Sequence, residues 1–316
     1  MTKRALGRTG LSIAPIVFGG NVFGWTADEK TSFDLLDRFF DAGYNAIDTA
    51  DVYSAWVDGH VGGESEAIIG KWLKRGHVPR DKAIVVTKVG FDNRGRKTGL
   101  SAKWIAEAVE ASLKRLGTDY IDLYLAHQPD EDTPHEETLA AFDRLMREGK
   151  VRAIGCSNFD AAQLQIALDV AARNNLPRYD VVQPEYNLHT RDKFEGPLAD
   201  LCIREEIGVI SYYALAAGFL TGKYRGKEDT EGSARAYRID DYLNDKGFRI
   251  LAALDEISAR TGAEPAAIAL AWLLRKPGLT APIASATSIR QLETMIAAGE
   301  LALSSDQMAA LDEAGA

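Results

Sequence analysis

Eight short apolar, β-branched segments alternate with longer amphipathic segments along nearly the whole 316-residue chain. Each short segment has the length of a buried strand, and each is followed by a pattern typical of a helix. Continuously apolar strands that alternate with helices form parallel sheets whose faces are covered by those helices. The expected strands are residues 15–19, 45–50, 82–90, 120–127, 151–158, 180–187, 208–215 and 279–286.

The amphipathic segments carry the boundary signals of helices. Asp160 with Gln163, and Ser288 with Gln291, have the spacing of a capping box at a helix start. Other expected helices end at glycines, which are typical of C-terminal caps and are Gly43, Gly76, Gly117 and Gly149.

Two architectures contain eight such units, a closed (β/α)8 TIM barrel and a doubly wound open sheet. The first expected strand is followed by GGNVFG (19–24), which does not match the GxGxxG usual in the open sheet. The pattern therefore favours a single (β/α)8 barrel domain over residues 1–316. Residues 4–15 are expected to form a hairpin at the barrel's bottom, and residues 216–260 a long loop plus an extra helix after strand seven.

Composition excludes several classes of function. The net charge of −9 argues against nucleic acid, because phosphate contacts need a basic surface. The N-terminal segment MTKRALGRTG has no apolar signal core, and no apolar run approaches the length of a membrane span. We therefore expect a soluble cytoplasmic protein with no membrane partner. The two cysteines lack zinc spacing, so no metal site is expected.

Ionisable side chains mark the ends of three consecutive expected strands. Asp48 ends an apolar segment and would be costly to bury unpaired, so a cationic partner is expected. Lys88 ends the next strand and His127 the one after it, while Tyr53 lies in the loop that follows Asp48. Each residue alone is more often a strand cap or a surface group. Together they point to the C-terminal mouth of a barrel, where active sites of this fold lie.

The chemistry of these four side chains is coherent. Lys88 and Asp48 can neutralise each other, and a lysine charge beside Tyr53 is expected to lower the tyrosine pKa. Tyr53 could then protonate an alkoxide, while His127 holds a carbonyl oxygen by a hydrogen bond. No side chain supplies a hydride, so carbonyl reduction at this site requires a cofactor.

Several blocks of the sequence resemble the aldo-keto reductase superfamily. They are IDTADVYS, VVTKVG, YLAHQPD, GCSNF, VVQPEYN, ALAAGFLTGKY and, near the C-terminus, SATSIRQL. The resemblance runs in order from the N-terminal hairpin through nearly the whole chain. It implies a catalytic tetrad of Asp48, Tyr53, Lys88 and His127 with Tyr53 as general acid. It also implies a nicotinamide cofactor bound across the barrel mouth without a Rossmann motif.

The resemblance further implies contacts to the nicotinamide. Ser157, Asn158 and Gln183 would hydrogen-bond its carboxamide, and Tyr212 would stack under its ring. The family commonly has Tyr-Ser-Pro-Leu at strand seven, whereas this chain has Tyr-Tyr-Ala-Leu over residues 212–215. The serine contact to the pyrophosphate is therefore replaced by Tyr213, which still offers a backbone N–H.

The loop from Leu215 to Lys223, including Gly218, would wrap the cofactor pyrophosphate. This agrees with the general position of phosphate sites after strands seven and eight of a barrel. The segment after strand eight would meet the 2′-phosphate of NADP through Ser285, Thr287, Ser288, Arg290 and Gln291.

Two departures bear on the choice of cofactor. The usual Glu-Asn pair near the adenine is Thr294-Met295 here. A helix N-terminus with hydroxyls can hold a phosphate, and Arg290 supplies a positive charge. No Asp or Glu is expected where the phosphate would bind. NADP(H) is therefore favoured, and NAD(H) stays an alternative.

These observations predict an oxidoreductase that reduces an aldehyde or ketone, or oxidises an alcohol or sugar in reverse. The substrate is expected to be a small carbonyl compound or sugar, and the oligomeric state is left open. A second interpretation is a nicotinamide-binding regulatory protein, since the superfamily includes channel-associated β-subunits. A third is a barrel enzyme for a sugar phosphate. Trp25, Trp56 and Phe91 are candidate pocket residues, and Tyr124 is expected in the core.

Overall fold

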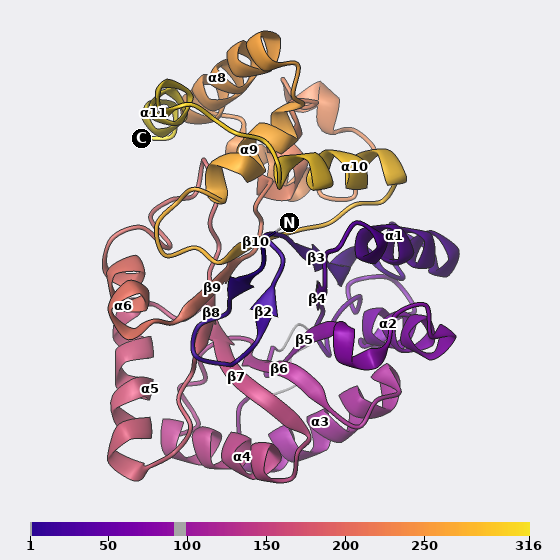
Figure 1. Ribbon diagram of the computed structural model, residues 1–316, viewed down its shortest axis with the longest axis vertical. Helices are drawn as coiled ribbons and strands as arrows, with labels where there is room; N and C mark the ends of the chain where they lie inside the picture. Colours follow the sequence, from indigo (N-terminus) through magenta and orange to yellow (C-terminus); the bar gives the residue numbers. More distant parts are fainter. Residues whose placement is uncertain (1, 92–98) are drawn as a thin grey trace.

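The computed structural model describes residues 2–91 and 99–316 of the chain. Within them, eight parallel strands close into a barrel in the order β10-β3-β4-β5-β6-β7-β8-β9 (Figure 1). The expected (β/α)8 barrel is thereby confirmed. The barrel strands are β3 (Val17–Gly19), β4 (Ala46–Asp48), β5 (Ile84–Val89), β6 (Ile121–Ala126), β7 (Val151–Ser157), β8 (Val181–Gln183), β9 (Gly208–Ser211) and β10 (Ala281–Ala284).

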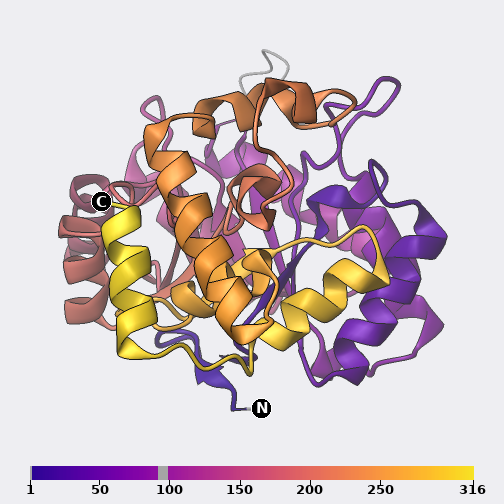
Figure 2. The ribbon, with the colours of Figure 1, turned by 90° about the horizontal axis from the view of Figure 1, so that it is seen from above.

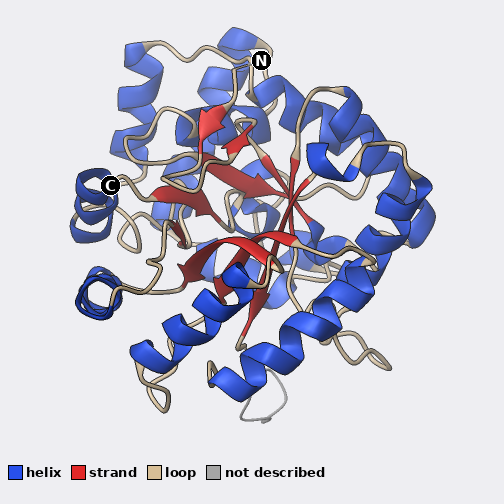
Figure 3. Cartoon of the chain, turned by 60° about the horizontal axis from the view of Figure 1, so that its bottom comes forward, coloured by secondary structure: helices blue, strands red, loops and turns tan. Residues whose placement is uncertain are grey.

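Helices surround these strands on all sides, as the view in Figure 3 shows. The last helix of the chain, α11, was not expected from the sequence. The helices are α1 (Glu29–Asp41), α2 (Glu64–Arg75), α3 (Ala102–Leu116), α4 (His135–Arg147), α5 (Ala161–Asn174), α6 (Pro197–Glu205), α7 (Ala236–Ile239), α8 (Asp245–Thr261), α9 (Pro265–Leu273), α10 (Ile289–Ala298) and α11 (Ser305–Ala314).

Two details of the expected elements differ from the structure. The capping box at Asp160 and Gln163 is complete, but at Ser288 only half of the expected box forms. The Gln291 side chain accepts a hydrogen bond from the Thr287 N–H at 2.8 Å, one residue before the cap. Strands are also shorter than their apolar patterns. β8 ends at Gln183 because the next residue, Pro184, has no N–H to continue the ladder.

Side chains on the strands alternate between the inside of the barrel and the helical layer. Ile84 and Val86 of β5 belong to the inner apolar cluster, whereas Val85 and Val89 pack into the outer one. The same parity places Lys88 inside the barrel and Thr87 outside it. This alternation determines which polar side chains reach the barrel mouth.

Two segments outside the repeat lie at opposite ends of the barrel (Figure 2). At one end, β1 (Arg4–Ala5) and β2 (Ser12–Ile13) form the expected antiparallel hairpin, and Leu6 and Ile13 join the inner apolar cluster. At the other end lies much of the segment between β9 and α8, which holds short helical turns and α7. The mouth next to this segment is where the C-terminal strand ends meet. In the described part of the chain, no helix combines the length and apolar character needed to cross a membrane.

Candidate active site

The alternation of side chains along the strands places three of the four expected side chains at the same mouth of the barrel. Asp48 follows the inward-facing Ala46 by two residues, and Lys88 follows the inward-facing Val86 by two. His127 follows the inward-facing Leu125 in the same way, one residue beyond β6. Neighbouring parallel strands end side by side, so these groups converge although they are far apart in the sequence.

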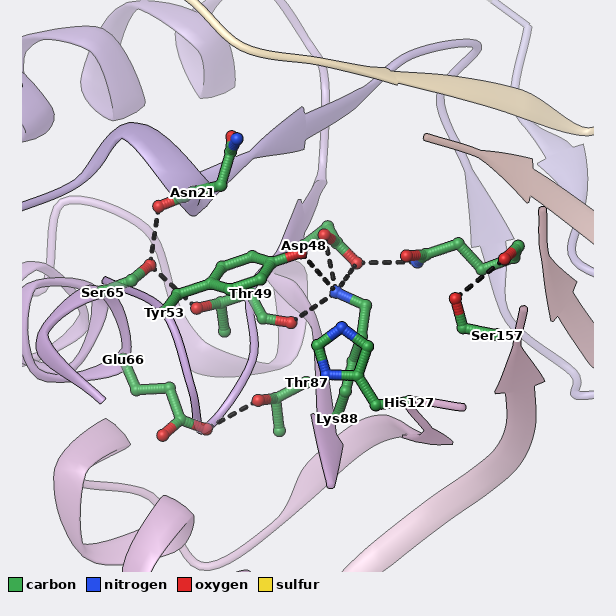
Figure 4. A network of polar contacts seen from close by, with 12 residues as sticks. Asn21, Asp48, Thr49, Tyr53, Ser65, Glu66, Thr87, Lys88, His127 and Ser157 are labelled. Carbon is green, nitrogen blue, oxygen red and sulfur yellow. Dashed lines mark hydrogen bonds and ion pairs between the residues drawn. The ribbon is translucent and has the colours of Figure 1, made fainter. Parts of the chain in front are cut away.

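Lys88 is the centre of the polar network in Figure 4. Its Nζ lies 2.8 Å from both carboxylate oxygens of Asp48 and donates to the backbone carbonyl of Thr49 at 2.7 Å. The Nζ also donates to the Tyr53 hydroxyl at 3.2 Å. The partner that the position of Asp48 requires is therefore Lys88, as expected.

The Asp48–Lys88 pair is almost fully buried, with 3% and 0% of the two side chains exposed. Burial raises the pKa of Asp48 and lowers the pKa of Lys88, and in each case the partner's charge opposes the shift. Gln183 Nε2 donates to Asp48 at 2.8 Å, so both charged groups have additional hydrogen bonds. A buried ion pair persists when its geometry is good and its other hydrogen-bonding groups are satisfied. We conclude that the two groups remain ionised.

The imidazole of His127 stands beside the network. Its ring centroid lies 6.1 Å from that of Tyr53 and 4.9 Å from that of Phe91. Burial, together with the charge of Lys88, holds the pKa of His127 well below its usual value. The ring is therefore neutral at physiological pH and offers one N–H donor and one acceptor nitrogen. Its Nδ1 is buried and forms no hydrogen bond with the described residues.

The expected lowering of the Tyr53 pKa is wrong for this structure. Burial raises the pKa of Tyr53 well above its usual value, and the negative charge of Asp48 raises it further. The main physical reason is the removal of the phenol from water, and the charge of Lys88 does not offset it because Lys88 is paired with Asp48 at contact distance. Tyr53 is thus protonated at neutral pH, which suits a proton donor.

The residues expected to meet a nicotinamide carboxamide lie together at the ends of β7, β8 and β9. Ser157 Oγ donates to the Gln183 carbonyl at 2.8 Å. Asn158 has a left-handed backbone with φ of 64°, and its Nδ2 donates to the His127 carbonyl at 2.8 Å. The Tyr212 hydroxyl donates to Asn158 Oδ1 at 2.7 Å. A chain of hydrogen bonds therefore links this group to Asp48 through Gln183.

The loop after β9 has an unusual backbone. Ala216, Ala217 and Gly218 have positive φ angles of 49°, 57° and 99° in succession, and Tyr213 precedes them with φ of 52°. A left-handed conformation costs roughly 1–2 kcal/mol for a residue with a side chain. Asn187 Nδ2 donates to the Tyr213 carbonyl at 3.0 Å and helps to hold this shape. Strain of this kind clusters at ligand-binding sites.

The segment expected to meet the 2′-phosphate of NADP lies between β10 and the start of α10. Ser285 Oγ donates to Asn21 Oδ1 at 2.7 Å, across the seam between β10 and β3. Ser288 caps α10, and Gln291 accepts from both the N–H and the hydroxyl of Thr287. Hydroxyl groups and a helix N-terminus therefore lie together, as the sequence predicts.

Comparison with known proteins decides the family. The sequence matches the family model described as Aldo/keto reductase family over residues 15–316. The chain belongs to the aldo/keto reductase family. It is 35% identical over 314 residues to the uncharacterized oxidoreductase YrpG of Bacillus subtilis, covering 98% of this chain and 94% of that protein.

Other relatives of this aldo/keto reductase carry different names. A putative voltage-gated potassium channel subunit beta of Schizosaccharomyces pombe is 33% identical, over 94% of this chain and 88% of that protein. The aldo-keto reductase AMT2 of Alternaria alternata is 30% identical, over 98% of this chain and 90% of that protein.

One expectation about the phosphate segment of this aldo/keto reductase is wrong. A carboxylate does lie there, since Glu264 Oε1 is 3.3 Å from Arg290 Nη2 and Glu264 Oε2 accepts from the Thr294 hydroxyl at 3.0 Å. Glu264 immediately precedes α9, and its position 26 residues upstream of Arg290 hid this contact in the sequence. Only the packing of α9 against α10 brings the two charges together.

The aldo/keto reductase also holds a cation that the sequence did not single out. Arg235, which precedes α7, lies with its guanidinium 5.3 Å from the centroid of the Trp25 ring. Among the described residues it forms no ion pair, and its charge opposes the upward shift of the Tyr53 pKa. Trp56 makes edge contacts at 5.6 Å with both Trp25 and Tyr53. The expected pocket tryptophans therefore lie beside the phenol.

Proposed function

We propose that this aldo/keto reductase is an NADP(H)-dependent oxidoreductase that reduces an aldehyde or ketone, with Tyr53 as the general acid. The reverse reaction, oxidation of an alcohol or sugar, uses the same groups. The observation that supports this proposal best is the hydrogen bond of 3.2 Å between Lys88 and a tyrosine whose pKa is raised. A neutral phenol backed by an ammonium can release a proton and tolerate the charge that remains.

Each side chain then has a distinct role in reduction. The Tyr53 hydroxyl transfers its proton to the substrate oxygen as negative charge develops there. Lys88 stabilises the resulting phenolate, and Asp48 keeps Lys88 protonated inside the barrel. The neutral His127 ring donates an N–H hydrogen bond that orients the carbonyl oxygen. Trp25 and Trp56 give the approaching substrate an apolar wall that limits access of water.

The hydride comes from a nicotinamide when it is bound, because no side chain can donate one. The residues at the mouth fit such a group. Ser157, Asn158 and Gln183 present polar atoms at the ends of adjacent strands, and the strained loop around Gly218 suits a pyrophosphate. Tyr212 is proposed to lie against the nicotinamide ring.

The preference for NADP(H) rests on the other end of the cofactor. Arg290 and the hydroxyls of Ser285, Thr287 and Ser288 form a set that suits a phosphate. Glu264 reduces the positive potential at Arg290, so NAD(H) remains an alternative. A cytoplasmic location stays a prediction from the sequence.

A panel of aldehydes, ketones, alcohols and sugars assayed with NADPH and NADH tests the proposal. We expect oxidation of NADPH with at least one carbonyl compound, and binding of NADPH measured by quenching of tryptophan fluorescence. Quenching without turnover on any substrate would contradict the enzymatic role. Absence of quenching by either cofactor would contradict the whole proposal.

A second candidate function is a nicotinamide-binding regulatory subunit with little turnover. It is favoured by the similarity to proteins named potassium channel β-subunits in Schizosaccharomyces pombe and in rice, the latter 34% identical over 301 residues. The two functions predict different results for the purified protein. A regulatory subunit binds NADPH and co-purifies with a membrane protein while its turnover stays slow, whereas a stand-alone enzyme turns over without a partner.

A further inference from the structure

A second group of ionisable side chains lies directly behind the four-residue site. Asp51 belongs to the short connection between Asp48 and Tyr53, and its backbone N–H donates to the carbonyl of Lys88 at 3.2 Å. Its Oδ1 is fully buried and forms no hydrogen bond with the described residues. A buried carboxylate oxygen without a donor is costly in its charged form. Packing alone therefore does not explain why a carboxyl group is buried at position 51.

A second buried carboxylate, Glu66, acts on Asp51, and the arginine nearest to it, Arg115, is already paired. Glu66 of α2 is buried, accepts from the Thr87 hydroxyl at 2.6 Å and pairs with Arg115 of α3, whose Nε lies 2.7 Å away. Figure 4 shows Thr87 reaching toward Glu66, whereas Lys88, the next residue of β5, reaches toward Asp48 and Tyr53. Because Arg115 is taken by Glu66, no cation makes direct contact with Asp51 among the described residues.

The ionisable groups that interact with Asp51 come from four elements of the fold. They are Glu66 on α2, Arg115 on α3, Lys88 on β5 and the phenol of Tyr124 on β6. Burial and the charge of Glu66 raise the pKa of Asp51 to about 7, while Arg115 and Lys88 oppose the shift. Such coupling is reciprocal, and the charge of Asp51 in turn raises the pKa of Lys88.

We propose that Asp51 is a positioning residue whose protonation, acting through Lys88, sets the pH dependence of carbonyl reduction and alcohol oxidation at this site. This inference rests on the proposed function of Tyr53. Below neutral pH Asp51 is neutral and leaves the charge of Lys88 unaltered. Above neutral pH Asp51 becomes an anion, holds the proton on Lys88 more firmly and disfavours a phenolate at Tyr53.

The sign of the effect follows from this charge. Removing the anion of Asp51 leaves the charge of Lys88 freer to stabilise a phenolate at Tyr53, so Tyr53 loses its proton at lower pH. Alcohol oxidation needs that phenolate, so the rising limb of its pH profile should move to lower pH in Asp51→Asn. Below about pH 6 the wild-type carboxyl is neutral, as is an asparagine, so the normalised profiles of the two proteins should coincide there.

The test compares Asp51→Asn with Asp58→Asn, which makes the same chemical change at an exposed position seven residues further along the segment between β4 and α2. We expect the rising limb of kcat for alcohol oxidation to shift down by roughly 0.5–1 pH unit in Asp51→Asn, the size typical of one partly screened charge. Asp58→Asn should show the wild-type profile. Binding of NADPH, measured by fluorescence at pH 6, should be unchanged in both variants.

A second readout does not depend on turnover. A carboxyl with a raised pKa in the folded state loses stability as pH rises from its unfolded value of about 3.9 toward 7. The Tm of Asp51→Asn minus that of wild type should therefore increase between pH 5 and 7.5. If Asp51→Asn does not fold, Asp51→Ser removes the same charge with a smaller side chain and serves for both measurements.

The outcomes separate this inference from the proposed function. A wild-type protein that turns over, with identical pH profiles for wild type, Asp51→Asn and Asp58→Asn, would overturn the role of Asp51 alone. A wild-type protein that binds NADPH but turns over no carbonyl or alcohol would overturn the function of Tyr53 instead. A Tm difference that is constant with pH would show that Asp51 does not titrate near neutrality and would also overturn the inference.

Discussion

The Nζ of Lys88 lies 3.2 Å from the hydroxyl of Tyr53, although the charge of the ammonium is directed mainly at Asp48, 2.8 Å away. Tyr53 is therefore protonated, and the ammonium of Lys88 lies where it can stabilise the phenolate that forms when the proton leaves. An interaction speeds a reaction only when it is stronger in the transition state than in the ground state. The attraction between Lys88 and Tyr53 meets this condition, because it strengthens only as the proton leaves the phenol.

The first prediction concerns Tyr53 itself. Tyr53→Phe removes the transferable proton and should lower kcat for carbonyl reduction roughly 10²- to 10⁴-fold. Affinity for NADPH should change little, because the phenol is expected to contact the substrate and not the cofactor phosphates. Steady-state kinetics and fluorescence titration measure the two quantities. Tyr237→Phe, at an exposed tyrosine of α7, is the matched control. Equal loss of binding and turnover would show a structural role.

The second prediction concerns the stability of the buried ion pair. Lys88→Met leaves Asp48 uncompensated and should lower the free energy of unfolding by about 3–5 kcal/mol. Adding Asp48→Asn to this variant removes the stranded charge and should restore part of the loss. Urea denaturation of the two single variants and the double variant measures the coupling. Strictly additive losses would mean that the two side chains do not depend on each other.

The fold and the centre of the site were predictable from the repeat of strands and helices. Eight strand–helix repeats implied the barrel, and the positions of Asp48, Lys88 and His127 at consecutive strand ends implied that they meet at one mouth. The barrel and the strand-end residues could be predicted because both depend on patterns among residues that are close together in the sequence. The residues at the ends of β7, β8 and β9 were identified through the resemblance to the aldo-keto reductase superfamily, whereas the hydrogen bonds among them were not predicted.

The features that sequence analysis missed depend on contacts between distant elements or on burial. Glu264 meets Arg290 only because α9 packs against α10, and Arg235 belongs to a segment without a repeating pattern. The direction of the Tyr53 pKa shift was wrong because proximity to a cation was weighed without the desolvation of the phenol. Desolvation depends on the whole packed structure, which no local motif encodes.

The third prediction concerns the choice between the two cofactors. Arg290→Ala should weaken binding of NADPH by about tenfold and leave NADH nearly unchanged, because a charge-assisted hydrogen bond contributes about 1.5–3 kcal/mol. Glu264→Gln should strengthen binding of NADPH by a factor of about 2–5, in line with the small energy of exposed ion pairs. Fluorescence titration with both cofactors measures these ratios. Arg260→Ala, near the end of α8, is the control. An unaltered preference in both variants would place the phosphate elsewhere.

The fourth prediction concerns His127 and acid pH. Burial and Lys88 hold its pKa well below the ordinary value of about 6.5 that it has in the unfolded chain. As pH falls through about 6.5, the unfolded chain therefore binds a proton that the folded protein does not, and stability is lost. His127→Asn removes this contribution, so its free energy of unfolding should fall less than that of wild type between pH 8 and 5.5. Urea denaturation at both pH values gives the difference, and His77→Asn at an exposed position is the matched control. Equal losses in wild type and His127→Asn would mean that the imidazole is protonated in the folded state, and His127 would then face the substrate as a cation.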